Sequence, residues 1–105
     1  MMSKRIVKMT FRPDAVETFV YQVFEPSKNQ IRAFPGCRYM ELLRQTNEPN
    51  VLFTLSHWDD ENALNAYRGS ALFADTWKKT KALFADKAQA WSVEVLDKPI
   101  SDNEN

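Results

Sequence analysis

The sequence predicts an α+β fold of the ferredoxin-like type, with the element order β-α-β-β-α-α-β and a four-stranded antiparallel sheet. Short runs of β-forming residues alternate with segments in which apolar residues recur every three or four positions, as in amphipathic helices. Proline and glycine stand where one element should end and the next begin. The 105 residues are about the size of one compact domain, so a single domain is expected.

The first half of the chain predicts one strand and one interrupted helix. Residues 6–11 are rich in β-formers, and Pro13 then suits the first turn of a helix. Apolar residues follow at helical spacing, at Val16, Phe19, Val20, Val23 and Phe24. Pro26 lacks the N–H that a helix interior needs, so we expect a kink or break near Phe24 before the helix continues to Phe34.

The middle of the chain predicts a β-hairpin followed by a helix. Residues 37–44 and 51–58 read as two strands, and the turn-forming run 46–50 between them makes a hairpin the natural connection. Asp59 is the expected N-cap of the next helix, which should end at Gly69.

The last third of the chain predicts a further helix and the fourth strand. The helix is expected to start after Ser70 and to carry a stripe of large apolar residues, Leu72, Phe73, Trp77, Leu83 and Phe84. The alternation over residues 91–96 predicts the last strand. We therefore expect one domain over residues 1–96 and a polar tail over residues 97–105.

The composition argues against several classes of partner and cofactor. Fourteen basic and fourteen acidic side chains give a formal net charge of zero. Proteins that bind nucleic acids or anionic membranes usually carry an excess of basic side chains. One cysteine, Cys37, and one histidine, His57, are too few for an internal disulfide, a multi-thiolate metal site or a multi-histidine haem site. Two glycines leave no Gly-rich phosphate loop, and no apolar run approaches the length of a membrane span. We expect a cytoplasmic protein without metal, haem or flavin.

Both faces of the predicted sheet are apolar. In the strand over residues 51–58, alternation places four side chains on each face: Val51, Phe53, Leu55 and His57 on one, and Leu52, Thr54, Ser56 and Trp58 on the other. Helices cover only one face of such a sheet, and an apolar second face is an association surface. A long loop over this face is the alternative, but the sequence has no loop long enough. The pattern therefore predicts a homodimer in which two sheets pack face to face.

The stretch over residues 53–67 resembles the signature of the antibiotic biosynthesis monooxygenase (ABM) family, in which the third strand ends in tryptophan and an acidic turn leads into an Ala-Leu helix. Ser70-Ala71-Leu72-Phe73 is similar to the start of the family's next helix, and Phe34-Pro35-Gly36-Cys37 to the turn before its second strand. The resemblance covers about residues 4–96. It implies a dimeric α/β barrel in which each subunit holds a pocket between sheet and helices. Many members of this family oxidise aromatic polyketides or quinols with O₂ and no cofactor.

The chain departs from one branch of the family that it resembles. The haem-degrading branch uses an asparagine on the first strand, a tryptophan on the helix after the third strand and a histidine on the next helix. By spacing, this chain has Tyr67 and Trp77 at the last two positions, and its first predicted strand contains no asparagine. Ser56 also stands where many members have a glutamate. The resemblance therefore does not imply haem degradation.

Candidate site residues cluster around the end of the third predicted strand. Trp58 could form the wall of a site for a flat aromatic ligand and donate its indole N–H to a carbonyl, although a core tryptophan fits the pattern equally well. Thr54 and Ser56 share its face and could orient substrate oxygens. His57 is the only side chain with an ordinary pKa near neutrality and is the candidate general base, but alternation places it on the opposite face. Further candidate binding residues lie on the following helices, at Tyr67, Phe73 and Trp77.

The resemblance implies a homodimer that binds a small hydrophobic or aromatic molecule and oxidises a quinol-type substrate without a cofactor. Two other functions stay open. One is a non-catalytic ligand-binding or stress-response barrel, and the other is an isomerase, which needs a positioned acid or base and no oxygen. Oxygen consumption with quinols would separate the first function from the other two.

Overall fold

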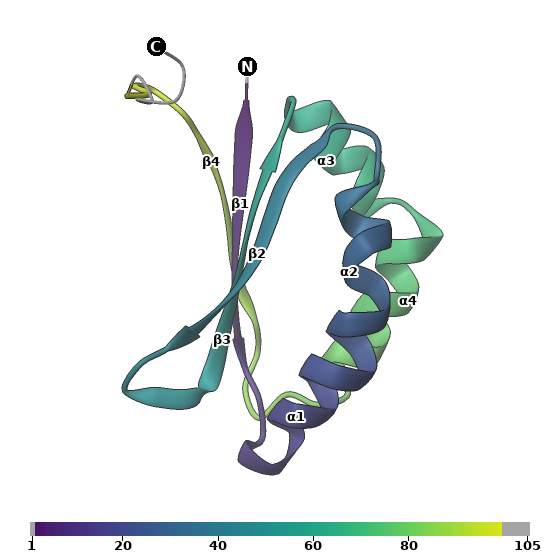
Figure 1. The fold of residues 1–105 in the computed structure, drawn as a ribbon, viewed down its shortest axis with the longest axis vertical. Helices are drawn as coiled ribbons and strands as arrows, with labels where there is room; N and C mark the ends of the chain where they lie inside the picture. Colours follow the sequence, from purple (N-terminus) through teal and green to yellow (C-terminus); the bar gives the residue numbers. More distant parts are fainter. Residues whose placement is uncertain (1, 100–105) are drawn as a thin grey trace.

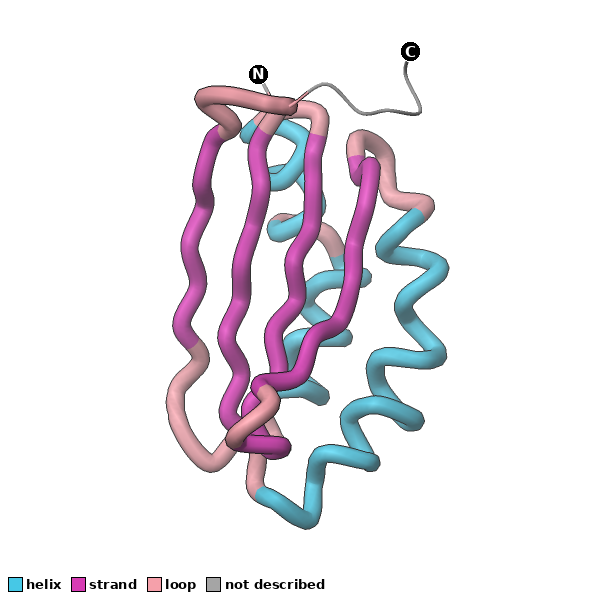
Figure 2. The backbone as a smooth tube through the Cα atoms, turned by 60° about the vertical axis from the view of Figure 1, so that its left-hand side comes forward, coloured by secondary structure: helices cyan, strands magenta, loops and turns pink. Residues whose placement is uncertain are grey.

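The computed structural model describes residues 2–99 and has the predicted order of elements (Figure 1). Its strands are β1 (Ser3–Thr10), β2 (Cys37–Gln45), β3 (Glu48–Trp58) and β4 (Gln89–Glu94). They form one antiparallel sheet in the order β2-β3-β1-β4. All helices lie on one face of this sheet, as Figure 2 shows. The predicted α+β, ferredoxin-like fold is confirmed.

The helical segment after β1 runs through Pro26 without a break. It consists of a 3-10 turn, a short α-helix, a π-helical segment and a longer α-helix: Pro13–Ala15, α1 (Val16–Thr18), Phe19–Phe24 and α2 (Glu25–Arg32). In the π-helical segment the N–H of Glu25 donates to the carbonyl of Val20, five residues back. The wider turn lies directly before the proline, where the α-helical hydrogen-bond pattern would otherwise be interrupted. Of the kink or break expected near Phe24, the break is wrong: the helix changes type there and continues.

The hairpin and the start of the next helix differ slightly from the prediction. Gln45 pairs with Glu48, so the connection is a tight turn at Thr46-Asn47, and β3 begins earlier than expected. The helix α3 (Glu61–Arg68) is capped by Asp60, whose carboxylate accepts the N–H of Ala63 at 2.8 Å. Asp59, the predicted cap, instead forms an ion pair with Arg38.

The helix α4 (Ala71–Lys81) starts as predicted but ends earlier. Ser70 caps it by accepting the N–H of Phe73 at 3.1 Å. Leu83 and Phe84 lie beyond its end, so they are not part of the helical stripe that the sequence suggested. Phe84 instead forms an isolated bridge to Phe11 and packs against the core. The strand β4 then begins two residues before the predicted position.

Gly36 fixes the approach of α3 to the start of β2. Its φ of 88° lies in the left-handed region, which glycine adopts without strain. A Cβ at this position would lie 2.4 Å from the Cβ of Ala63 on α3, and the Gly36 carbonyl accepts the N–H of Asp59 at 2.8 Å. Close packing at this turn therefore brings α3 against one end of the sheet.

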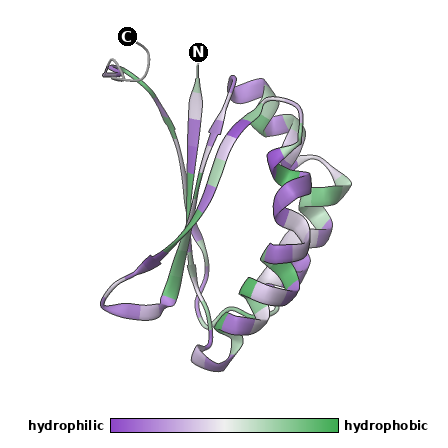
Figure 3. Ribbon diagram, in the orientation of Figure 1, coloured by the Kyte–Doolittle hydropathy of each residue, from purple (hydrophilic) through white to green (hydrophobic). Residues whose placement is uncertain are grey.

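The core fills the space between the helices and one face of the sheet. Its most deeply buried members come from β1 and the residue just after it, from β2 and β3, and from the helical segment that follows β1: Met9, Phe11, Phe19, Met40 and Leu52. In Figure 3 the ribbon is coloured by hydropathy. The hairpin between β2 and β3 is hydrophilic, and the part of β3 next to it is hydrophobic. Within residues 2–99, no helix has both the length and the apolar character needed to cross a membrane.

The other face of the sheet is uncovered and carries large apolar side chains together with three charged ones, Lys4, Lys8 and Glu41. We call it the open sheet face and define it by Ile6, Tyr39, Leu43, Phe53, Leu55, Trp91 and Val93. The strand register places Leu55 beside Ile6, and Ile6 beside Trp91. On the two edge strands, Trp91 of β4 is 46% exposed and Tyr39 of β2 is 45% exposed, which is high for large aromatic side chains. No helix or loop within residues 2–99 covers this face (Figure 2).

Candidate functional site

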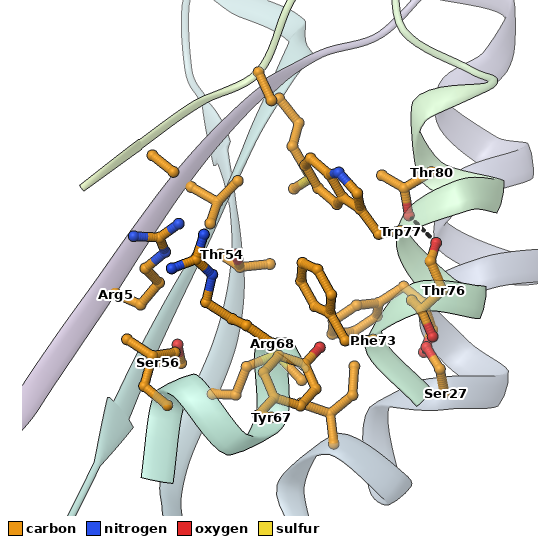
Figure 4. A pocket seen from close by; sticks show the side chains of 18 of the residues that line it. Arg5, Ser27, Thr54, Ser56, Tyr67, Arg68, Phe73, Thr76, Trp77 and Thr80 are labelled. Atoms are coloured by element: carbon orange, nitrogen blue, oxygen red, sulfur yellow. Dashed lines mark hydrogen bonds between the residues drawn. The ribbon is translucent and has the colours of Figure 1, made fainter. Parts of the chain in front are cut away.

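A cavity of about 290 Å³ lies between the sheet and the helices (Figure 4). Alternate residues of β1 and β3 line its sheet side: Arg5, Val7, Met9, Thr54, Ser56 and Trp58. The helices α3 and α4 line the opposite side, with Tyr67, Arg68, Phe73, Thr76 and Trp77. The cavity therefore uses the face of β3 that points away from the open sheet face.

The structure brings six of the seven predicted site residues around this cavity. They are Thr54, Ser56, Trp58, Tyr67, Phe73 and Trp77. His57 lies across the sheet, where its ring packs against Tyr39 at 4.9 Å between centroids. Partial burial, helped by the positive charge of Lys4, lowers the pKa of His57 below its ordinary value. His57 is therefore not positioned to exchange a proton with a ligand in the cavity.

Trp58 is both a wall of the cavity and a part of the packed interior. Its side chain is 1% exposed, and its ring stacks on Tyr67 at 5.0 Å between centroids. The indole N–H donates to the Ser56 hydroxyl oxygen at 3.0 Å. The donor that the sequence analysis assigned to a substrate carbonyl is thus already in use. The Ser56 hydroxyl accepts this bond and keeps its own hydrogen for another acceptor.

Aromatic rings form a continuous row on the helix side of the cavity. Tyr67 meets Phe73 edge-on at 5.3 Å between centroids, and Phe73 stacks on Trp77 at 5.9 Å. With the Trp58–Tyr67 stack, four rings follow one another from β3 across α3 to α4. Each aromatic pair of this kind contributes about 0.5–1.5 kcal/mol of stability beyond that of the area it buries. This wall is suited to a flat aromatic ligand.

The Tyr67 hydroxyl is a hydrogen-bond donor that the protein leaves unused. Burial raises the pKa of Tyr67 to about 12, and the neighbouring Cys37 raises it further in the same direction. Within residues 2–99, this hydroxyl has no hydrogen-bond partner. Every fully buried polar side-chain atom of that range does have one. The hydroxyl oxygen therefore keeps some accessible surface, and Tyr67 lines the cavity. A neutral phenol there would donate a hydrogen bond to a ligand and would not act as a base near neutral pH.

We predict that Tyr67 ionises near pH 12, well above an ordinary tyrosine near pH 10. Because the folded state holds this proton more tightly, its contribution to the free energy of unfolding is complete below pH 10. About 2–3 kcal/mol of stability is then lost as the pH rises from about 10 to 12. The difference in phenolate absorbance between the wild-type and Tyr67→Phe proteins checks this. Tyr39, whose pKa is also raised by its hydrogen bond to Glu41, is present in both proteins and cancels. A difference spectrum with its midpoint near pH 10 would contradict the prediction.

Two arginines of the cavity were missed by the sequence analysis. Arg5 comes from β1 and Arg68 from the last turn of α3, and Figure 4 shows their guanidinium groups close together beside Thr54. Arg5 alternates with Val7 and Met9, which is a signal that it points to the helix side. Only the strand register, which the sequence does not show, places Arg5 opposite Ser56 and so in the site.

The side chains around the cavity include no conventional base. Among the described residues that line it, there is no Asp, Glu, His, Lys or Cys. Its polar side-chain groups are hydroxyls, the indole N–H groups of Trp58 and Trp77, and the two guanidinium groups. No three His, Cys, Asp or Glu side chains within residues 2–99 gather as a metal site. The cavity can thus bind an aromatic ligand and donate hydrogen bonds to it.

Comparison with known proteins identifies the family and the fold. The family model described as antibiotic biosynthesis monooxygenase matches residues 2–79. Rv0793 from Mycobacterium tuberculosis has a similar structure, with a TM-score of 0.84 and 20% identity over 93% of this chain and 98% of that one. A conserved protein from Methanosarcina mazei Go1 gives a TM-score of 0.84 and 16% identity over 89% and 91%. A variant of SnoaB, a cofactor-independent oxygenase from Streptomyces nogalater, gives 0.79 and 15% over 92% and 95%.

The search of curated proteins finds no match. The structural neighbours are less than a quarter identical to this chain, so they establish the shared fold. The family model covers well over half of the sequence, and it includes β1, the hairpin, α3 and most of α4. This chain belongs to the antibiotic biosynthesis monooxygenase family.

Proposed function

We propose that this protein binds a small aromatic molecule in the cavity and oxidises a quinol-type substrate with O₂, without a cofactor. The observation that carries the proposal is that a row of four aromatic rings, from Trp58 on β3 to Trp77 on α4, lines the same cavity as the hydroxyls of Thr54 and Ser56. Membership of the family and the fold shared with a cofactor-independent oxygenase support the reaction type. The lone cysteine supports a reducing location, and we assign the protein to the cytoplasm.

The proposed reaction asks little of the protein beyond shape and exclusion of water. A quinol that has lost a proton reduces O₂ directly, and one oxygen atom becomes bonded to a ring carbon. The balanced products are a hydroxyquinone, which has gained one oxygen and lost two hydrogens, and one molecule of water. The ring would lie against Tyr67, Phe73 and Trp77, while Thr54 and Ser56 orient its oxygens. The packed walls hold the reacting pair together and keep solvent from it.

The experiment uses 1,4-naphthohydroquinone and isotopically labelled O₂. Turnover should give 2-hydroxy-1,4-naphthoquinone with one labelled oxygen, together with labelled water. Uncatalysed oxidation gives unlabelled 1,4-naphthoquinone and hydrogen peroxide, so mass spectrometry and a peroxide assay separate the two. Tyr67→Phe should slow the labelled reaction, whereas His57→Gln should leave it unchanged because His57 lies across the sheet. A labelled product no faster than in the protein-free control would refute the oxygenase proposal.

A second candidate function is ligand binding without turnover. The observation in its favour is that the described lining residues include no carboxylate, imidazole, amine or thiol. The same feature disfavours an isomerase, which needs a positioned acid or base. A rise in melting temperature with 1,4-naphthoquinone, without any labelled product from the quinol, would favour the binding protein.

The proposal includes a homodimer formed through the open sheet face. Large apolar side chains of all four strands lie on this face, and a second copy is the partner whose surface matches it in size and chemistry. A net charge of zero leaves little long-range repulsion between copies. In such a dimer each subunit keeps its own cavity, because β3 lines the cavity with the opposite set of side chains.

A further inference from the structure

We propose that Arg5 and Arg68 form an anion subsite in the cavity and that the natural ligand is an aromatic acid whose carboxylate binds between them. The inference rests on the proposed function, because it takes the cavity to be the ligand site and names the class of ligand. The aromatic wall accounts for the binding of a ring, and the two arginines add the requirement that the ligand carries an anionic group.

The two arginines come from different layers of the fold and meet at the cavity. Arg5 is half-buried on β1, and its Nη1 donates to the Ser92 hydroxyl of β4 at 2.8 Å. Arg68 is more exposed and follows Tyr67 in the last turn of α3. Figure 4 shows the nitrogen atoms of both side chains next to each other, over the β1–β3 part of the sheet. A guanidinium group has five N–H donors, so the single bond from Arg5 leaves most of its donors free for a ligand.

Neither arginine has an acidic partner among the described residues. The ion pairs within residues 2–99 are Lys28–Glu25, Arg38–Asp59 and Lys79–Asp75. Burial lowers the pKa of Arg5, and the positive charge of Arg68 lowers it further. Two adjacent cations at a partly buried site are unfavourable unless an anion compensates them. The lining residues supply no carboxylate, so the compensating anion would arrive with the ligand.

A planar carboxylate fits the two guanidinium groups better than a spherical anion does. The planar fork of a guanidinium group donates two parallel hydrogen bonds to a carboxylate, and two arginines can hold both of its oxygens. Tyr67, the second ring of the aromatic row from Trp58 to Trp77, lines the same cavity as Arg68. A cavity of about 290 Å³ is at the small end of ligand sites, which suits one or two fused rings. Acid at one end and ring at the other define the proposed ligand.

The test compares two probes of the same shape by isothermal titration calorimetry. 2-Naphthoate carries the carboxylate, and 2-naphthamide replaces it with a neutral group. The wild type should bind the naphthoate at least about tenfold more tightly, since a hydrogen bond to a charged group contributes about 1.5–3 kcal/mol. Arg5→Gln and Arg68→Gln should each weaken naphthoate binding about tenfold to a hundredfold and leave naphthamide binding nearly unchanged.

The matched control is Arg44→Gln, which makes the same change of net charge at an exposed arginine outside the cavity lining. It should bind both probes as the wild type does. Because Arg68 is exposed, Arg68→Gln should fold even if Arg5→Gln does not. Equal affinity for the two probes would overturn the anion subsite and leave the proposed ligand site standing, whereas binding of neither would refute both. Tighter binding of 2-naphthyl phosphate than of 2-naphthoate would overturn the choice of a carboxylate.

Discussion

The Trp58→Ala variant is expected to lose about 3–5 kcal/mol of its free energy of unfolding, as large aromatic residues in cores do. Trp58 is among the largest fully buried side chains and contacts the rings of Phe34 and Tyr67. Its removal leaves a void, and the Ser56 hydroxyl loses the indole N–H that it accepts. Since small domains have a total stability of about 5–15 kcal/mol, the loss is a large fraction of the whole. Urea unfolding of the two proteins measures it directly.

Tyr21→Ala provides the comparison for this prediction. Tyr21 is also a large aromatic side chain, but it is 68% exposed on the helical segment after β1. Its replacement should change the free energy of unfolding by no more than about 0.5 kcal/mol. A loss of less than about 1 kcal/mol for Trp58→Ala would be no more than an average substitution causes, and would rule out Trp58 as a principal core residue.

The Leu55→Lys variant is expected to convert the proposed dimer of two 12.2 kDa chains into a monomer. Leu55 lies in the middle of the open sheet face, between Ile6 on β1 and Glu41 on β2. In the monomer the new ammonium group lies beside Glu41 in water, so folding should survive. Two face-to-face sheets would bury that charge in each subunit, and even beside Glu41 its desolvation should cost about 3 kcal/mol or more, or about a hundredfold in Kd. Sedimentation equilibrium at micromolar concentration reports the mass.

Tyr21→Lys makes the same kind of change, an exposed apolar side chain to lysine, on the helical layer away from the sheet face. It should remain dimeric. A wild-type protein that sediments as a 12.2 kDa species at micromolar concentration would remove the basis of the prediction, and a dimer that tolerates Leu55→Lys would place the interface elsewhere.

Local sequence signals were enough for most of the fold. Proline, glycine and capping residues marked the ends of the elements, and period-two and helical patterns gave their types. The exception at Pro26 has a physical reason, because a π-helical segment places a five-residue hydrogen bond before the proline. A proline alone does not say whether a helix will break or widen. The choice of Asp60 over Asp59 as cap depended on Arg38, which is distant in sequence and pairs with Asp59.

The candidate site could be predicted only in part from the sequence. Alternation along β3 separated Thr54, Ser56 and Trp58 from His57. The hydrogen bond from Trp58 to Ser56 joins two residues of one strand face, but which acceptor the indole finds depends on its rotamer. Arg5 and Arg68 stayed hidden because each is unremarkable in its own element. Their juxtaposition is created by the packing of α3 against β3, the strand that pairs with β1, and no local pattern encodes it.

Alternate residues of the strand β3 contribute to the cavity and to the open sheet face. The number of residues in this strand is therefore more constrained than the identity of each residue. Substitutions at Thr54 or Ser56 can alter the cavity while the open sheet face stays the same, and substitutions at Phe53 or Leu55 do the reverse. A single inserted or deleted residue within the strand would turn every side chain beyond it to the other side. The hydroxyls would then face outward, and leucine and histidine would fill the ligand space. Relatives of this protein should therefore vary freely in sequence along this strand and yet tolerate insertions only at its ends.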